Sequence, residues 1–236
     1  MRDTASNKTV NQRLNLLLLG TCLFLFSSCS ENTEYEKETP TASLEQNTKL
    51  RKILDQYKDK NTKKGDVAKG IEFMLAGNYE EAGHCFNRVL VVDPSNAKVH
   101  MLNGINYQLQ SRDGNVQQLD VAKAGFIQAL KFDSNLVLAS LHLGRVYKAE
   151  KEYVKAQEEF SNTLLLDPEN PDAAYELATT SYLAGDLKIA RPMIERYLKK
   201  RPNDPAGIHS AAVIRAATGD AKGAQQALKS LRKIEG

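Results

Sequence analysis

Apolar residues recur every three to four positions through residues 137–170, which read VLASLHLGRVYKAEKEYVKAQEEFSNTLLLDPEN. A polar break at residues 150–152 divides this pattern into two segments. Because an α-helix turns once every 3.6 residues, this spacing places the apolar side chains on one face of each segment. The pattern therefore predicts two amphipathic helices joined by a tight turn.

The same skeleton appears before and after this stretch, so the helix pair is the unit of a repeat. Five copies align, over residues 63–96, 97–136, 137–170, 171–204 and 205–236. In each copy a small residue of the first helix permits close approach, and a bulky residue of the second helix fills the space beside it. These pairs are Gly70 and Phe86, Gly104 and Phe126, Gly144 and Phe160, Ala178 and Ile194, and Ala212 and Leu228.

Glycine and short polar residues mark the predicted helix ends. Glycines suited to a left-handed backbone are expected to end first helices, and Asn or Asp residues to cap the helices that follow. The predicted ends are Gly77, Gly185 and Gly219; the predicted caps are Asn78, Asp186 and Asp220 for second helices, and Asn170 and Asp204, each before a proline, for first helices.

These residues are those of the tetratricopeptide repeat, and the chain resembles that family from about residue 63 to 236. The resemblance implies an all-α superhelical solenoid of about five helix-turn-helix repeats, with first helices lining a concave surface. Residues 47–62 also show helical spacing and are predicted to form an N-terminal helix that packs against the first repeat. Six extra residues in the second copy, within residues 110–120, are expected to lengthen the loop and the helix ends beside it, as a tolerated surface loop or a partner contact.

Residues 1–28 have the pattern of a secretory signal peptide. Basic residues precede an apolar stretch, residues 14–26, that is too short to span a bilayer comfortably as a permanent helix. The sequence Phe26-Ser27-Ser28-Cys29 is similar to the bacterial lipobox, although that motif prefers Leu where Phe26 stands. This resemblance implies cleavage and lipidation at Cys29; Cys22 is a rival site, and an ordinary signal peptide or an uncleaved anchor is the alternative.

The residues that follow Cys29 suggest how the folded part is attached. By the same resemblance, Ser30 after the cysteine favours the outer membrane, with the protein facing the periplasm. Residues 29–46 are polar and lack an apolar period, so they are predicted to form a flexible tether from the lipidated cysteine.

Catalytic, metal and cofactor motifs are not found in the sequence. It has no CxxC, no HExxH and no Gly-rich phosphate loop, and its four histidines fall at four different repeat positions. We expect the net charge of +3 to be spread along the chain, which is too diffuse for a nucleic-acid binding surface. Cys85 is expected to be a small buried core residue. We therefore expect no catalytic residue, no metal, no cofactor and no enzyme activity.

The family resemblance implies that the concave surface is a peptide-binding groove. Its expected residues are Lys64, Ile71, Met74, Lys98, Met101, Ile105, Leu141, Arg145, Lys148, Tyr175, Tyr182 and His209. A largely apolar lining suits an amphipathic helix or an extended peptide. Tyr175 and Tyr182 would anchor it, and Arg145 with Lys148 would hold an acidic side chain or a C-terminus. The alternative is that many of these side chains pack between neighbouring first helices.

A lipobox, a tether and a repeat array together resemble the lipoproteins that help assemble type IV and tight-adherence pili. In those families the lipoprotein is a pilotin or assembly factor for an outer-membrane secretin. The resemblance implies a non-enzymatic, lipid-anchored interaction scaffold whose partner is a secretin or pilus-assembly protein. The alternative is a repeat lipoprotein that recruits enzymes for envelope maintenance or polysaccharide export.

Overall fold

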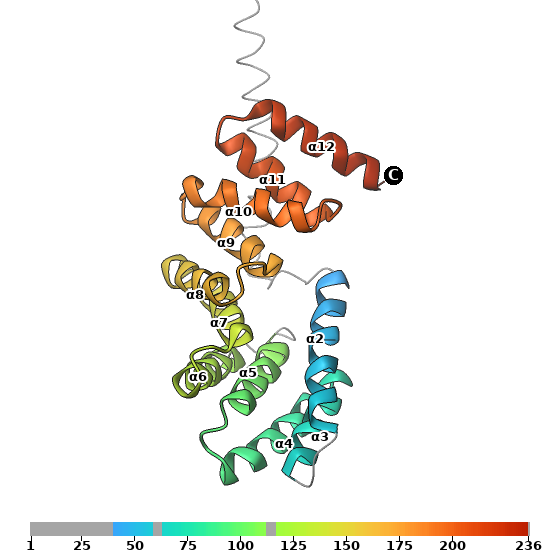
Figure 1. Cartoon of the computed structure of the whole chain (residues 1–236), viewed down its shortest axis with the longest axis vertical. Helices are drawn as coiled ribbons and strands as arrows, with labels where there is room; N and C mark the ends of the chain where they lie inside the picture. Colours follow the sequence, from blue (N-terminus) through green and yellow to red (C-terminus); the bar gives the residue numbers. More distant parts are fainter. Residues whose placement is uncertain (1–39, 59–62, 112–116, 236) are drawn as a thin grey trace, which may run out of the picture.

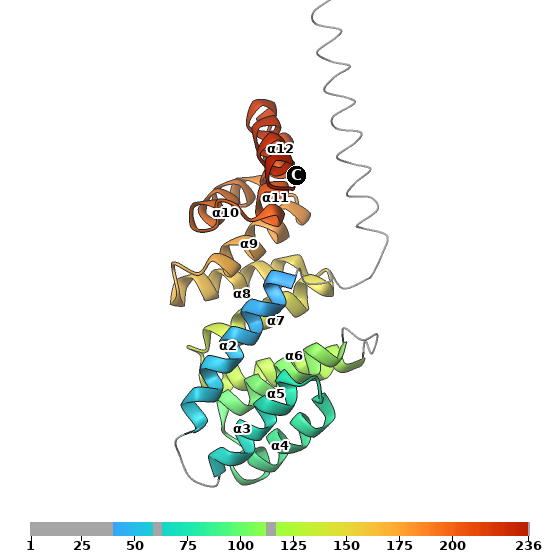
Figure 2. The same ribbon diagram turned by 90° about the vertical axis from the view of Figure 1, so that its right-hand side faces the viewer.

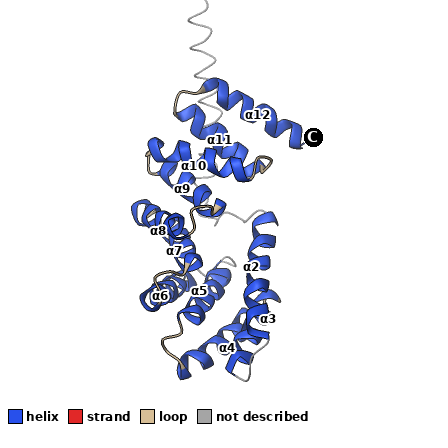
Figure 3. Cartoon of the chain, viewed as in Figure 1, coloured by secondary structure: helices blue, strands red, loops and turns tan. Residues whose placement is uncertain are grey.

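The computed structural model describes residues 40–58, 63–111 and 117–235, and within these residues it contains helices and turns and no strand (Figure 3). The predicted signal peptide, Cys29 and residues 30–39 of the predicted tether lie outside this part. The helices are α2 (Pro40–Lys58), α3 (Lys63–Leu75), α4 (Tyr79–Val92), α5 (Ala97–Ser111), α6 (Gln117–Phe132), α7 (Val137–Ala149), α8 (Tyr153–Leu166), α9 (Pro171–Leu183), α10 (Leu187–Lys200), α11 (Pro205–Ala217) and α12 (Ala221–Glu235). The predicted all-α array of five helix pairs after an N-terminal helix is confirmed.

The helices form a curved stack in which each one packs on its neighbours in sequence (Figure 1). The first helices of successive pairs, α3, α5, α7, α9 and α11, also contact one another. The second helices, α4, α6, α8, α10 and α12, make no comparable contact with each other in the described part of the chain. The stack therefore curves toward the first helices, which line its inner face.

A close contact between a backbone and an aromatic ring holds each of the first three pairs together. A Cβ atom placed on Gly144 would lie 2.6 Å from Cε1 of Phe160, well inside van der Waals contact. The same geometry recurs at Gly70 with Phe86 and at Gly104 with Phe126, and all three rings are fully buried. The predicted role of these small and bulky residues is confirmed.

The turns inside the pairs depend on one left-handed residue. Gly77, Gly185 and Gly219 each have φ of 81° and follow the end of a first helix, as predicted. In the third pair Lys151 takes the corresponding position with φ of 62°, the sole non-glycine residue with positive φ in the described chain. A side chain makes this conformation costly, so the third turn is less favourable than the others.

Four of the five predicted caps bond to the backbone of the helix that they precede. Carboxylate or amide oxygens accept from the backbone N–H three residues on, at 3.1 Å for Asn170, 2.6 Å for Asp204, 3.3 Å for Asp186 and 2.8 Å for Asp220. The prediction for Asn78 is wrong, because its side chain makes no such bond at the start of α4.

The N-terminal helix differs from its predicted span. Helix α2 begins at Pro40, seven residues before the predicted start at residue 47, and ends at Lys58. Residues 40–46, which were assigned to the flexible tether, are helical. A proline fits the first turn of a helix because its missing N–H has no partner there, and the Glu and Gln that follow are good helix formers.

The insertion in the second pair lengthens both of its helices, as expected. Helix α5 has 15 residues and α6 has 16, compared with 13 in α7 and 14 in α8. The residues between them, 112–116, lie outside the described part of the chain.

We predict that Gly144→Ala destabilises the chain by about 1–3 kcal/mol, because the added methyl overlaps the ring of Phe160. The fourth pair suggests a rescue, since it holds Ala178 against Ile194 at the same two positions. The double variant Gly144→Ala/Phe160→Ile should be less destabilised than the sum of the two single changes by about 1 kcal/mol. Urea unfolding followed by circular dichroism measures this, and strictly additive losses would contradict a direct contact.

Candidate protein-binding surface

Helix α2 lies on the inner face of the stack, on the side of the first helices (Figures 1 and 2). It packs against α3 and extends past the first pair toward α9. In Figure 2 it runs in front of α7 and down toward α3. The concave face therefore already holds a helix supplied by the chain itself.

Apolar side chains hold the C-terminal half of α2 in place. Leu50 and Leu54 are buried, and Ile53 and Tyr57 are half-buried. All four lie at helical spacing and belong to the same packed cluster as the first helices α3 and α5. Burying two leucine side chains contributes on the order of 3–6 kcal/mol before the entropy of ordering the helix is subtracted.

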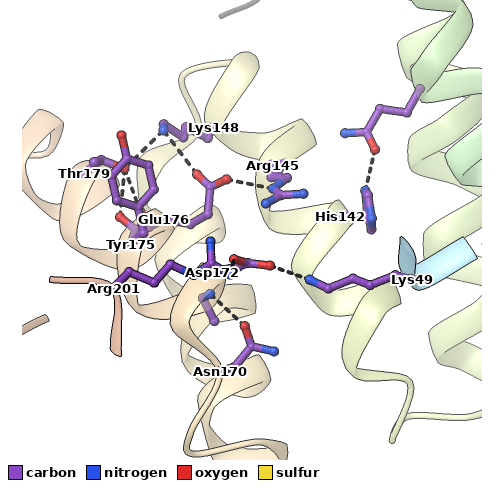
Figure 4. A network of polar contacts seen from close by, with 12 residues as sticks. Lys49, His142, Arg145, Lys148, Asn170, Asp172, Tyr175, Glu176, Thr179 and Arg201 are labelled. Carbon is purple, nitrogen blue, oxygen red and sulfur yellow. Dashed lines mark hydrogen bonds and ion pairs between the residues drawn. The ribbon is translucent and has the colours of Figure 1, made fainter. Parts of the chain in front are cut away.

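A charged contact joins α2 to the fourth pair. The ammonium of Lys49 contacts Oδ2 of Asp172, at the start of α9, and Arg201 at the end of α10 reaches Oδ1 of the same carboxylate at 3.1 Å (Figure 4). The Asp172 side chain is only 12% exposed. Two cations therefore neutralise a largely buried carboxylate, and this contact positions the N-terminal half of α2 along the groove.

A second carboxylate lies one turn further along α9. Glu176 accepts from Nε of Arg145 at 2.7 Å and from Nζ of Lys148 at 3.2 Å, and Lys148 also donates to the Thr179 hydroxyl at 3.1 Å (Figure 4). Burial alone would raise the pKa of Glu176, but the charges and hydrogen bonds of Lys148 and Arg145 outweigh it and lower the pKa. The network ties α7 to α9 and keeps the carboxylate ionised.

The sequence-based interpretation of Arg145 and Lys148 needs correction. Both cations were expected to hold an acidic group of a partner, and in the structure Glu176 of the same chain fills that role. Glu176 was missed because it does not occupy one of the repeat positions that face the groove in the family. The sequence did contain a signal for Glu176, which was the pattern of charges. Two cations precede this carboxylate by about one repeat, and Asp172 lies four residues before it on the same helix.

The apolar part of the predicted lining is also corrected. Five of its residues are at most 4% exposed and pack within the stack, namely Ile71, Met74, Met101, Ile105 and Leu141. Four of these share the cluster that includes Leu50 and Leu54 of α2. These five side chains are buried in the packing between helices, which is the alternative that the sequence left open, and they do not form an open apolar groove.

The other predicted groove residues are more accessible. Tyr175, Tyr182 and His209 are half-buried and lie on α9 and α11, and Lys98 is exposed on α5. The Tyr175 ring packs on that of Tyr197 with centroids 5.0 Å apart, and its hydroxyl lies 3.3 Å from that of Ser210. Lys64 lies in α3, and its side chain is outside the described residues. Among the predicted groove residues, the accessible ones therefore lie mainly on α9 and α11, with Lys98 on α5.

Other chemistry in the described chain is structural. Cys85 is buried, as predicted, and accepts a hydrogen bond from Arg88. His142 is buried between Phe126 and Gln108, whose Oε1 lies 2.6 Å from Nδ1. Within residues 40–58, 63–111 and 117–235 no group of three or more potential ligands could hold a metal ion. None of the helices there is long and apolar enough to cross a membrane.

Comparison with known proteins agrees with this fold. Residues 147–214 match the tetratricopeptide repeat family. Cellulose synthase operon protein C of Pseudomonas fluorescens (strain SBW25) is 26% identical over 106 residues, which cover 45% of this chain and 8% of that protein. The chain thus matches a small part of that relative.

Solved structures show the same architecture over most of the chain. A crystal structure of MamA has a TM-score of 0.63 at 19% identity and covers 70% of this chain and 94% of that one. MamA 41-end from Desulfovibrio magneticus RS-1 has a TM-score of 0.65 at 17% identity, with coverages of 73% and 94%. At these identities the likeness shows the fold, a solenoid of the tetratricopeptide repeat type.

We predict that Glu176→Gln destabilises the chain by about 2–3 kcal/mol at pH 7, because it leaves Arg145 and Lys148 facing a neutral amide. The folded-state pKa of Glu176 lies below its unfolded value of about 4.3, so its ionic contribution is present above that pH. That contribution is lost as the pH falls through the folded-state pKa. The difference between wild type and variant should therefore shrink in acid.

Urea unfolding at neutral and acidic pH measures this difference. Glu158→Gln, an exposed carboxylate on α8, is the matched control and should change stability little at either pH. A Glu176→Gln deficit that is the same at both pH values would show that the effect does not come from the ionised carboxylate.

Proposed function

We propose that the chain is a non-enzymatic scaffold that binds a helical segment of a partner protein on its concave face. The observation that carries this proposal is α2, an amphipathic helix seated on that face. Its contacts combine leucines at helical spacing with one cation aimed at a carboxylate of the groove. A partner helix with leucines and a cation at the same spacing would make the same contacts, in the helix-in-groove mode of recognition.

The accessible part of the concave face is where such a partner helix would make its first contacts. Leu183, at the C-terminal end of α9, is 41% exposed, and Tyr182 beside it is half-buried. Tyrosine and leucine side chains that remain partly exposed on a concave face suit protein contact, because an aromatic anchor buries a large area at low entropic cost. A partner would engage α9 and α11 first and then compete with α2 for the rest of the groove.

We further propose that this scaffold is lipid-anchored through Cys29 in the bacterial envelope, most simply in the outer membrane facing the periplasm. Its partner would be a secretin or another component of a pilus or secretion system. The lipobox-like sequence before Cys29 and the resemblance of the repeats to pilus-assembly lipoproteins support this assignment.

A second candidate is a scaffold for polysaccharide export or envelope maintenance. It is favoured by the sequence likeness to cellulose synthase operon protein C, although that match covers a small part of the relative. In this case the groove would recruit an enzyme or a component of the export machinery. The two candidates share the same fold and binding mode and differ in the partner.

A photo-crosslinking residue placed at Leu183 should capture the partner in cells, because this exposed position belongs to α9, one of the first helices that line the inner face. The matched control is Val154, which is 68% exposed but lies on the second helix α8. We expect one dominant adduct from position 183 and none from position 154. Adducts of equal yield at both positions, or an adduct from 154 alone, would exclude the concave face as the binding site.

Deleting the gene should lower the amount of secretin multimers in outer-membrane fractions and the number of surface pili. Wild-type protein should restore both, and a Cys29→Ser variant should not, because it cannot receive an acyl anchor. A deletion strain with normal multimers and pili but less exported polysaccharide would reject the first candidate and support the second. Normal levels of all three would reject both.

A further inference from the structure

The charge of the chain is unevenly distributed along the stack. Residues 187–236 contain eleven Lys or Arg and four Asp or Glu, a net charge of +7, so residues 1–186 carry a net charge of −4. The expectation of a diffuse charge is therefore wrong: the last three helices, α10, α11 and α12, are basic, and the chain before them has a net negative charge. A small overall charge of +3 hides this asymmetry.

A pocket of about 610 Å³ lies where this basic end meets the preceding residues 169–174. It lies between the start of α9 and the C-terminal half of α10. Pro171 and Ala174 contribute apolar surface, and Arg196, Lys199 and Lys200 contribute positive charge. In the first three pairs the two positions of Lys199 and Lys200 are Val91 and Val92, Lys131 and Phe132, and Leu165 and Leu166, so the paired cations are specific to the fourth pair.

The cations of this pocket have little internal compensation. Lys200 contacts Glu169, a carboxylate that is 70% exposed at the pocket wall. Lys200, and to a smaller extent the charge of Arg196, lowers the pKa of Glu169, so this one carboxylate faces two of the three cations. By contrast, Arg191 and Arg215 elsewhere in the same basic end are paired with Asp220 and Glu195. The pocket therefore combines a hollow with a local excess of positive charge.

The shape and surroundings of the pocket favour a protein carboxylate over a membrane surface. A lipid surface requires a flat basic face with exposed apolar side chains that enter the interface. The exposed apolar residues at the equivalent positions of the preceding pair, Leu165 and Leu166, lie on α8 and do not line the pocket. Those on α9 and α10 themselves, Leu183 and Ile189, lie at the opposite helix ends from the pocket.

We infer that this pocket is a second docking site, which receives an acidic segment of a partner protein. One Asp or Glu of that segment displaces Glu169 from Lys200, and a neighbouring carboxylate reaches Arg196 or Lys199. An apolar side chain of the segment contacts Pro171 and Ala174. The site is distinct from the concave face and does not require the lipid anchor, so it can be tested independently of the proposed function.

The test uses the full chain carrying Cys29→Ser, so that no acyl group contributes. The probe is a fluorescein-labelled peptide of Glu, Ala and Leu, and its binding is measured by fluorescence anisotropy at low salt, where exposed charges are least screened. Arg196→Glu/Lys199→Glu should weaken binding about tenfold, since two attractive contacts become repulsive. Glu169→Gln should tighten binding about twofold to threefold, because the internal competitor is removed.

Two controls separate the pocket from general electrostatic attraction. Lys222→Glu/Lys229→Glu makes the same charge change at exposed positions of α12, and Glu158→Gln matches the change at Glu169. Neither should alter binding by more than about twofold. Equal losses in the two double variants would overturn the proposal.

Two further measurements bear on the identity of the ligand. A peptide with Gln in place of Glu should not bind. Vesicles of phosphatidylcholine with phosphatidylglycerol should not bind the wild-type chain more than they bind the Arg196→Glu/Lys199→Glu variant. Binding to these vesicles that depends on the pocket, without binding of the acidic peptide, would assign the site to anionic lipid and reject a protein ligand.

Discussion

The contact between an aromatic ring of the second helix and a glycine backbone of the first helix sets the geometry of the first three helix pairs. Phe160 lies so close to Gly144 that no side chain fits between them, and the same contact recurs in the two preceding pairs. Because this approach is the same in these three pairs, they stack in the same way, and their first helices gather on the inner side of the curve. The seat for α2 and the ion pairs across the groove follow from that arrangement.

Helix α9 links neighbouring helices of the stack through two of its carboxylates. Asp172 and Glu176 lie four residues apart on one side of this helix, and their partners come from α2, α7 and α10. Each carboxylate is only 12% exposed and is neutralised by two cations, so neither is left as an uncompensated buried charge. Polar contacts of this kind require particular partners, and they fix how α2 and the third pair sit relative to α9.

The sequence predicted the fold well because each copy of the repeat is a local pattern. The roles of Gly144, Phe160 and the helix-end glycines can be predicted from the residues near them in the sequence. The binding surface was harder to predict, because an apolar residue such as Ile71 is equally suited to an open groove or to a covered one. What decides between them is α2, and its docking depends on contacts between residues as far apart as Lys49 and Asp172. Repeat positions alone do not contain that pairing.

The position of α2 also sets a threshold for any competitor. Only four residues separate the end of α2 from the start of α3, so the helix is tethered next to the face that it covers. A short tether of this kind gives a local concentration on the order of millimolar. A free helix that makes the same contacts would have to exceed that concentration, or bind more tightly, to replace α2. A partner helix must therefore bind the groove strongly enough to compete with α2. Helices that bind weakly are excluded whatever their sequence.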